Sequence, residues 1–174
     1  LDFHKTMENY RRAKAMLFAR CETGVFNLDD PAAEAMMRDA TCRCYTVGTT
    51  AAAQLVGEEI DLAADHVALT LREGETAARL RLGIPGRFTV SNALVAAGVA
   101  RQLGIGLDAA AKAMAGAKGV KGRIEVVPTP GKDYTVLIDY AHTPDGLENV
   151  LRSVRDFCKG RLIVLFGCGG DRDR

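Results

Sequence analysis

Hydrophobic residues in the N-terminal part of the chain recur first with helical spacing and then with the spacing of short strands. From Thr6 to about Arg20 the apolar residues fall on one face of a predicted helix, which Thr6 can cap. Further along, Asp30 and Pro31 are typical of a helix start. The elements predicted after the first helix are a strand at 25–27, a helix at 30–40 and a strand at 45–47. This order indicates the βαβ rhythm of an α/β fold.

The pattern changes between residues 52 and 82, where apolar residues begin to alternate along the chain. Val67, Leu69 and Leu71 alternate with small or polar residues. A turn at 73–75 then leads into a second run at 77–81. Alternation on both sides of a short glycine-containing turn predicts an antiparallel hairpin inserted into the α/β part.

Helical spacing returns after the Pro and Gly residues at 83–86. An alanine-rich helix is predicted from Ser91 to Leu103, and a shorter helix from 108 to 115. The glycine-rich stretch 116–122 has no periodicity and is interpreted as a linker. We therefore predict two domains, with residues 1–121 in the first and 122–174 in the second.

The second domain is predicted to contain a βαβ unit of a Rossmann-like parallel sheet with a right-handed crossover. Thr143 and Pro144 mark the start of its helix. The predicted elements are strands at 123–127 and 134–140, a helix at 144–158 and a strand at 162–166. Because one βαβ unit is a poor stopping point for a domain, we expect the chain to be a segment of a longer protein.

Composition limits the classes of function. The chain has 174 residues, of which 48% are hydrophobic and 26% charged, and a net charge of +1. These values are ordinary for a globular protein and do not indicate a nucleic-acid-binding surface. No apolar run approaches the roughly 20 residues of a membrane span, and the first residues lack the layout of a signal peptide. We expect a cytoplasmic protein with no nucleic-acid or membrane partner.

Five cysteines are an odd number, so they do not all pair, and they are not arranged as a disulfide framework. Cys42 and Cys44 could form half of a zinc site, but no second Cys or His pair lies near them in the sequence. We interpret them as reduced thiols on a strand.

Polar, glycine-containing segments follow two predicted strands of the second domain, at 139–145 and 167–174. Open α/β sheets usually bind their ligands at the carboxyl ends of parallel strands. This placement is typical of an enzyme that uses a nucleotide.

Six short motifs appear in an order that resembles the Mur ligases of peptidoglycan synthesis. They are Leu1-Asp-Phe-His-x-x-Met-Glu-x-Tyr-x-x-Ala-Lys14, Asn27-x-Asp-Asp30, Gly86-x-Phe-x-Val-x-Asn92, Gly119-Val-x-Gly-Arg123-x-Glu125, Asp139-Tyr-Ala-His-Thr-Pro-Asp145 and Gly167-Cys-Gly-Gly-Asp-Arg-Asp173. The resemblance is greatest to the branch that adds the third stem residue to UDP-N-acetylmuramoyl-L-alanyl-D-glutamate (MurE type). It covers nearly the whole chain, as the later part of the central ATPase-type α/β domain and the start of the C-terminal domain.

The resemblance implies a monomeric ligase with ATP and Mg²⁺ as cofactors. ATP would convert a carboxylate of the UDP-MurNAc-dipeptide to an acyl phosphate, which the amine of meso-diaminopimelate or L-lysine would attack. No Gly-x-x-Gly-Lys-Ser/Thr phosphate loop occurs in these residues, and the family carries it upstream. We therefore expect this chain alone to be inactive.

Lys14 resembles the family lysine that is carbamylated and holds a magnesium ion. Its position beside Tyr10 and Leu17 predicts partial burial, which would favour the neutral amine that reacts with carbon dioxide. A carbamate would supply the hard oxygen ligands that Mg²⁺ prefers. The pattern alone favours the alternative, a surface lysine whose aliphatic stem covers apolar neighbours.

Asn92 resembles a residue that contacts adenine from the first turn of its helix. A second family asparagine is replaced by Thr89, which leaves one adenine contact open. The alternative for Asn92 is an amide bonded to free backbone groups at a helix start.

Four residues of the second domain resemble ligand-binding residues of the family. The resemblance implies that Arg123 lies near the base or ribose, Asp139 accepts ribose hydroxyls, and His142 helps to order the phosphate side. It also implies that Arg172 pairs with the carboxylate of the incoming amino acid. The alternatives are a solvated arginine at a strand end, a locally bonded loop histidine and an ordinary glycine-rich turn.

Two other functions compete with this interpretation. A related ligase, of the folylpolyglutamate or cyanophycin synthetase type, would share the ATP machinery but usually varies the 139–145 motif. A non-catalytic nucleotide-binding module is favoured only by the absence of the phosphate loop.

Overall fold

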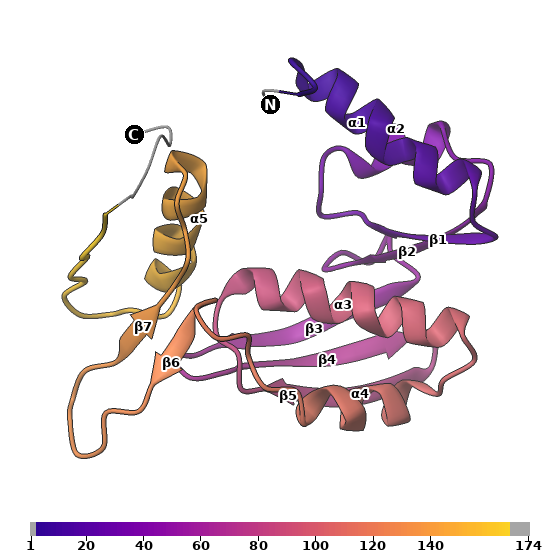
Figure 1. The fold of residues 1–174 in the computed structure, drawn as a ribbon. Helices are drawn as coiled ribbons and strands as arrows, with labels where there is room; N and C mark the ends of the chain where they lie inside the picture. Colours follow the sequence, from indigo (N-terminus) through magenta and orange to yellow (C-terminus); the bar gives the residue numbers. More distant parts are fainter. Residues whose placement is uncertain (1–2, 168–174) are drawn as a thin grey trace.

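The computed structural model describes residues 3–167 of the chain. A five-stranded mixed sheet forms the larger part, and α3 runs along one of its faces with α4 beside it (Figure 1). A smaller unit of β6, β7 and α5 follows it in the chain. The mixed α/β class expected from the sequence is confirmed.

The large sheet joins a parallel half to an antiparallel half. Its strands are β1 (Thr23–Asn27), β2 (Arg43–Gly48), β3 (Leu55–Leu62), β4 (Val67–Glu73) and β5 (Thr76–Leu82), in that spatial order. The β1–β2 and β2–β3 pairs are parallel, whereas β3–β4 and β4–β5 are antiparallel. The predicted hairpin is therefore present as β4 and β5.

The helices are mostly short. They are α1 (Met7–Ala15), α2 (Ala33–Arg38), α3 (Arg87–Gln102), α4 (Leu107–Ala115) and α5 (Pro144–Arg155), and a 3₁₀ helix (Met16–Ala19) extends α1. Thr6 and Thr143 cap α1 and α5 as predicted, since their hydroxyls each accept a backbone N–H at 3.1 Å. Within residues 3–167, no helix has both the length and the hydrophobicity that crossing a bilayer would require.

Helix α3 holds the two halves of the sheet together through close packing. Gly98 faces the parallel half, where an added Cβ atom would lie 2.8 Å from Val47 Cγ1 and 2.9 Å from Val25 Cγ1. Leu94 packs against the antiparallel half at Gly57, and is fully buried. One continuous apolar core therefore runs beneath α3 and α4.

A polar network ties α3 to the sheet. The Tyr45 hydroxyl on β2 donates to the Glu73 carboxylate at the end of β4. Arg101 of α3 donates from Nε to the same carboxylate at 2.7 Å, and from Nη1 to the Ile105 carbonyl. Burial first, and then the bond to Glu73, raise the pKa of Tyr45 above its ordinary value.

Several elements differ from the sequence predictions. Helix α3 begins at Arg87, four residues before the predicted start, because Gly86 adopts a φ of 100° at its N-cap. Asp30 caps a turn through Ala32 N at 2.8 Å, and α2 begins only at Ala33. Strand β3 was not predicted, since it is rich in acidic residues and its pairing with β4 is irregular after Glu58.

The βαβ unit predicted from the strand at 134–140 to the strand at 162–166 is present only in part. Strands β6 (Glu125–Val127) and β7 (Val136–Ile138) form an antiparallel pair and α5 follows β7, but residues 161–167 have no regular structure. The apolar side chains of residues 163–166 are exposed, and Leu165 is 99% exposed. A β-branched run alone does not make a strand, because a strand also needs a neighbouring edge to bond.

We predict that Gly98→Ala lowers the free energy of unfolding of the chain by about 1–2 kcal/mol. Overpacking costs roughly 1–3 kcal/mol, and the better helix propensity of alanine offsets up to about 1 kcal/mol. The stiff, buried side chain of Val47 leaves little room to adjust. Denaturant titration followed by circular dichroism measures the change.

The matched control for this prediction is Gly83→Ala. Nothing lies within 4 Å of a Cβ atom at Gly83, so this variant should unfold at nearly the wild-type denaturant concentration. Equal stability of the two variants would contradict the proposed close approach of α3 to β1 and β2.

Candidate active site

The pairing of β6 with β7 brings two of the predicted ligand residues to one edge. Glu125 is the register partner of Ile138, so the residues just before β6 and just after β7 are neighbours. Arg123 lies on the first of these segments, and Asp139 on the second. The sequence instead predicts that the 139–145 and 167–174 segments share an edge, and most of the second segment lies outside the described residues.

Asp139 ties the two segments together through backbone hydrogen bonds. Its Oδ2 accepts from Ile124 N at 2.8 Å, and its Oδ1 accepts from Ala141 N at 2.7 Å. Ile124 is buried and has a φ of 40°, a conformation that costs energy for a β-branched residue. The bond from Asp139 helps to hold this conformation, and the carboxylate retains lone pairs that could accept ligand hydroxyls.

Three side chains beside this edge form a row, in the order Arg123, Tyr140 and His142. The guanidinium carbon of Arg123 lies 5.4 Å from the centroid of the Tyr140 ring. The Tyr140 and His142 rings are 5.0 Å apart. His142 Nδ1 lies 2.9 Å from the Tyr140 carbonyl oxygen, which can only accept, so Nδ1 carries the proton. In neutral His142 the Nε2 atom is then left as an acceptor.

Lys14 lies on α1, away from this cluster (Figure 1). Its Nζ is 5.5 Å from the centroid of the Tyr10 ring, as the helical spacing predicted. The Lys14 side chain is exposed, however, and so is Leu17. The partial burial predicted for Lys14 is therefore absent in the described part of the chain.

Asn92 lies in the second turn of α3, not in the first turn as predicted, because the helix begins earlier. Its side chain is exposed and makes no hydrogen bond within residues 3–167. The alternative of an amide capping the helix start is therefore not observed. Thr89 points inward, where its buried hydroxyl donates to the Pro85 carbonyl at 3.2 Å.

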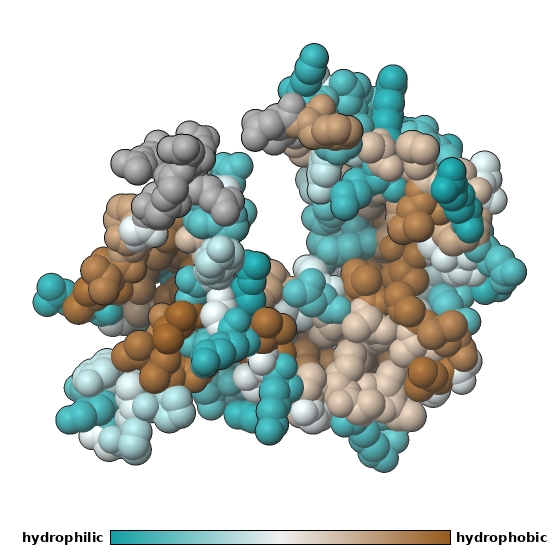
Figure 2. Space-filling view, in the orientation of Figure 1, coloured by the Kyte–Doolittle hydropathy of each residue, from teal (hydrophilic) through white to brown (hydrophobic). Residues whose placement is uncertain are grey.

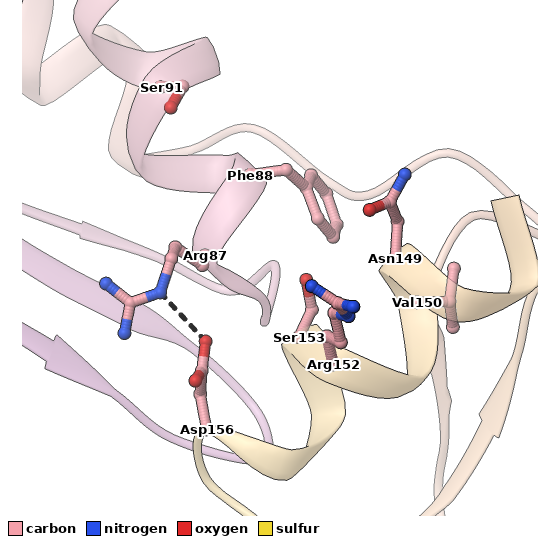
Figure 3. Close-up of a pocket in the computed structure, with 8 residues that line it drawn as sticks. All are labelled: Arg87, Phe88, Ser91, Asn149, Val150, Arg152, Ser153 and Asp156. Carbon is pink, nitrogen blue, oxygen red and sulfur yellow. Dashed lines mark hydrogen bonds and ion pairs between the residues drawn. The ribbon is translucent and has the colours of Figure 1, made fainter. Parts of the chain in front are cut away.

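A cavity of about 570 Å³ lies between the start of α3 and the later turns of α5 (Figure 3). Across it, Arg87 Nε donates to Asp156 Oδ2 at 2.9 Å. The lining residues are Arg87, Phe88, Ser91, Asn149, Val150, Arg152, Ser153 and Asp156. The sequence analysis missed this cavity, since its walls come from distant segments and no motif links them.

The remaining candidates can be placed only in part. Arg172 lies outside the described residues, as does most of the 167–173 motif.

The four cysteines within residues 3–167 carry free thiols, and burial is the main cause that raises the pKa of Cys44. In the same residues, no group of three or more His, Cys, Asp or Glu side chains could hold a metal ion.

Hydrophobic surface is exposed around the smaller unit (Figure 2). Tyr134, Val136, Ile138 and Tyr140 contribute to it from the β7 region, and residues 163–166 contribute beyond α5. Arg123 and His142 therefore lie next to exposed apolar surface, to which Tyr140 belongs.

Family models match both parts of the chain. The model of the Mur ligase middle domain matches residues 1–100. The model described as Mur ligase, glutamate ligase domain matches residues 122–174, which contain the Arg123–His142 cluster.

Individual relatives agree with these matches. A UDP-N-acetylmuramoyl-L-alanyl-D-glutamate–2,6-diaminopimelate ligase of Syntrophomonas wolfei is 41% identical over all of this chain, which spans 36% of that relative's length. A solved structure of a ligase with the same name is 31% identical, with a TM-score of 0.76 over 98% of this chain and 36% of that structure.

A more distant structure shares the fold alone. The MurF ligase of Thermotoga maritima in complex with ADP is 17% identical, with a TM-score of 0.66 over 88% of this chain and 36% of that structure. Since the middle-domain model covers more than half of the chain and a 41% identical relative aligns with all of it, the chain belongs to the Mur ligase family.

Proposed function

We propose that the full-length protein containing this chain is an ATP-dependent ligase of peptidoglycan synthesis. It would join UDP-N-acetylmuramoyl-L-alanyl-D-glutamate to a third stem amino acid. The observation that carries the proposal is the 41% identity to a diaminopimelate ligase across the entire chain. That relative also favours 2,6-diaminopimelate over L-lysine as the amino acid added.

The reaction would proceed in two steps, formation of an acyl phosphate and then of the amide. A substrate carboxylate oxygen attacks the γ-phosphorus of ATP, which forms an acyl phosphate and releases ADP. The amine of the amino acid then attacks the acyl carbon, and an amide forms as phosphate leaves and the amine loses a proton. Negative charge on the transferring phosphoryl group requires oriented donors and cations around it.

The cluster beside β6 and β7 is suited to the nucleotide side of this reaction. Asp139 would accept ribose hydroxyls with its remaining lone pairs, and Arg123 would contact the base or ribose. His142 would help to order the phosphate side of the nucleotide. Asn92 would read the adenine edge, and Arg172 would pair with the carboxylate of the incoming amino acid.

The described residues do not by themselves form a magnesium site. A carbamate on Lys14 would supply oxygen donors, but no cluster of further acidic or histidine ligands accompanies it within residues 3–167. We propose that Lys14 is carbamylated in the full-length ligase.

Several further properties belong to the same proposal. The division between the two domains would fall near residue 121, and the protein would be a cytoplasmic monomer. The 174 residues alone would not catalyse the reaction, because they contain no phosphate-binding loop of the Gly-x-x-Gly-Lys-Ser/Thr type.

The direct test incubates the full-length protein with ATP, Mg²⁺ and the UDP-MurNAc-dipeptide, and adds meso-diaminopimelate, L-lysine or L-alanine separately. We expect ADP and a product of the mass of the diaminopimelate adduct. Product with L-lysine alone would reassign the amino acid. Absence of any ATP-dependent adduct would contradict the proposed ligase.

We predict that Asn92→Ala raises the KM for ATP about two- to tenfold, which corresponds to the loss of one hydrogen bond. The KM for the UDP-MurNAc-dipeptide should not change. Because the Asn92 side chain is exposed and unbonded in residues 3–167, folding stability should also stay at the wild-type value. Steady-state kinetics and thermal unfolding measure the three quantities, and an unchanged KM for ATP would remove Asn92 from the site.

We predict that Lys14→Ala lowers kcat of the full-length ligase by roughly 10²–10³-fold, as expected when a charge-stabilising group is removed. Acetate or another short-chain carboxylate should restore part of the activity, because it can replace the carbamate oxygens. Peptide mass spectrometry in bicarbonate should detect the adduct on the wild-type residue.

The control for this prediction is Lys112→Ala, which removes an exposed lysine that pairs with Asp108 on α4. It should retain full activity and show no response to acetate. Wild-type activity in Lys14→Ala would return Lys14 to an ordinary surface lysine.

A further inference from the structure

Tyr140 connects two predicted ligand residues, although it was not itself predicted to have a role. Its ring lies 5.4 Å from the Arg123 guanidinium carbon on one segment and 5.0 Å from the His142 ring on its own segment. The Tyr140 carbonyl also accepts from His142 Nδ1. Both the ring and the backbone of this residue therefore contact neighbouring site residues.

The ring contact restrains a side chain that is otherwise free. Within residues 3–167, the Arg123 side chain makes no hydrogen bond or ion pair, and Arg123 is exposed. A guanidinium near an aromatic face is attracted by the ring quadrupole. The backbone beside Arg123 is already held, since Ile124 N donates to Asp139. The ring thus adds a side-chain restraint to a fixed backbone.

The Tyr140 hydroxyl has no such role in the described residues. It makes no hydrogen bond there, and the residue is 59% exposed. The aromatic ring and the hydroxyl can therefore be separated by experiment.

We infer that Tyr140 is a positioning residue, whose ring orients the Arg123 guanidinium for the nucleotide. The inference rests on the proposed ATP-dependent ligase. The orientation of the Arg123 guanidinium would depend on the Tyr140 ring and not on its hydroxyl. Tyr140 would therefore affect ATP binding only through Arg123.

The experiment compares Tyr140→Phe, which keeps the ring, with Tyr140→Leu, which removes it, in the full-length protein. A cation–π contact at an exposed site corresponds to about a two- to fivefold change in binding. We therefore expect Tyr140→Leu to raise the KM for ATP by that factor, whereas Tyr140→Phe stays near wild type. The KM for the UDP-MurNAc-dipeptide should not change in either variant.

Tyr134→Leu is the matched control. Tyr134 precedes β7 in the same unit and is 56% exposed, but in residues 3–167 it takes part in no ring or cation–π contact. Its loss should leave the KM for ATP unchanged.

A double-mutant cycle tests the route through Arg123. In an Arg123→Ala background, Tyr140→Leu should cause no further rise in the KM for ATP. A further rise, a loss in Tyr140→Phe equal to that in Tyr140→Leu, or an unchanged KM in Tyr140→Leu would each overturn the inference.

NMR of the arginine side chains separates this inference from the proposed function. The ring should shift the Arg123 side-chain protons upfield in wild type and Tyr140→Phe but not in Tyr140→Leu, with Arg123→Ala used for assignment. Absence of the shift in wild type would overturn the stacking itself. A wild-type protein that shows the shift but no ATP-dependent ligation would instead contradict the proposed function.

Discussion

The close approach of α3 to the sheet is the contact on which the larger part of the structure depends. Gly98 lets the helix backbone reach Val25 and Val47 of the parallel strands, and Leu94 of the same helix fills the space above Gly57 on β3. One helix thereby holds both halves of a sheet whose strand direction changes at β3. The position of α3 also determines where its first turns lie, and these carry Asn92 and one wall of the cavity beside α5.

The smaller unit depends on the hydrogen bonds of Asp139. Its two strands have only three residues each, so strand pairing alone provides few contacts. Asp139 bonds Ile124 and Ala141 through their backbone N–H groups and so joins the segments on which Arg123 and His142 lie. The same carboxylate is the proposed acceptor of ribose hydroxyls. The structural role and the proposed ligand-binding role therefore fall on one side chain, so loss of Asp139 would disturb both together. The side chains of Tyr140 and Asn92 make no hydrogen bond within residues 3–167, so their proposed roles can be tested without breaking such a bond.

Local signals predicted most of the elements. Threonine caps located α1 and α5, and alternating apolar residues located the β4–β5 hairpin, because these features depend on neighbouring residues. Strand β3 was missed, since its acidic residues conceal a strand that tertiary packing over Leu94 supports. The strand predicted at 162–166 was wrong for the opposite reason, because its strong β propensity meets no partner edge in the described residues.

The site was predictable only where the motif residues flank paired strands. Arg123, Asp139 and His142 lie together because the β6–β7 register places their segments side by side. The common edge expected from the sequence was that of the 139–145 and 167–174 segments, and most of the second segment lies outside the described residues. Side-chain surroundings could not be inferred in the same way. Helical periodicity placed Lys14 beside Tyr10 but could not show that this face is exposed in residues 3–167. The Tyr140 ring contact likewise depends on two segments meeting in space, so the 139–145 motif contains Tyr140 but cannot reveal its contact with Arg123.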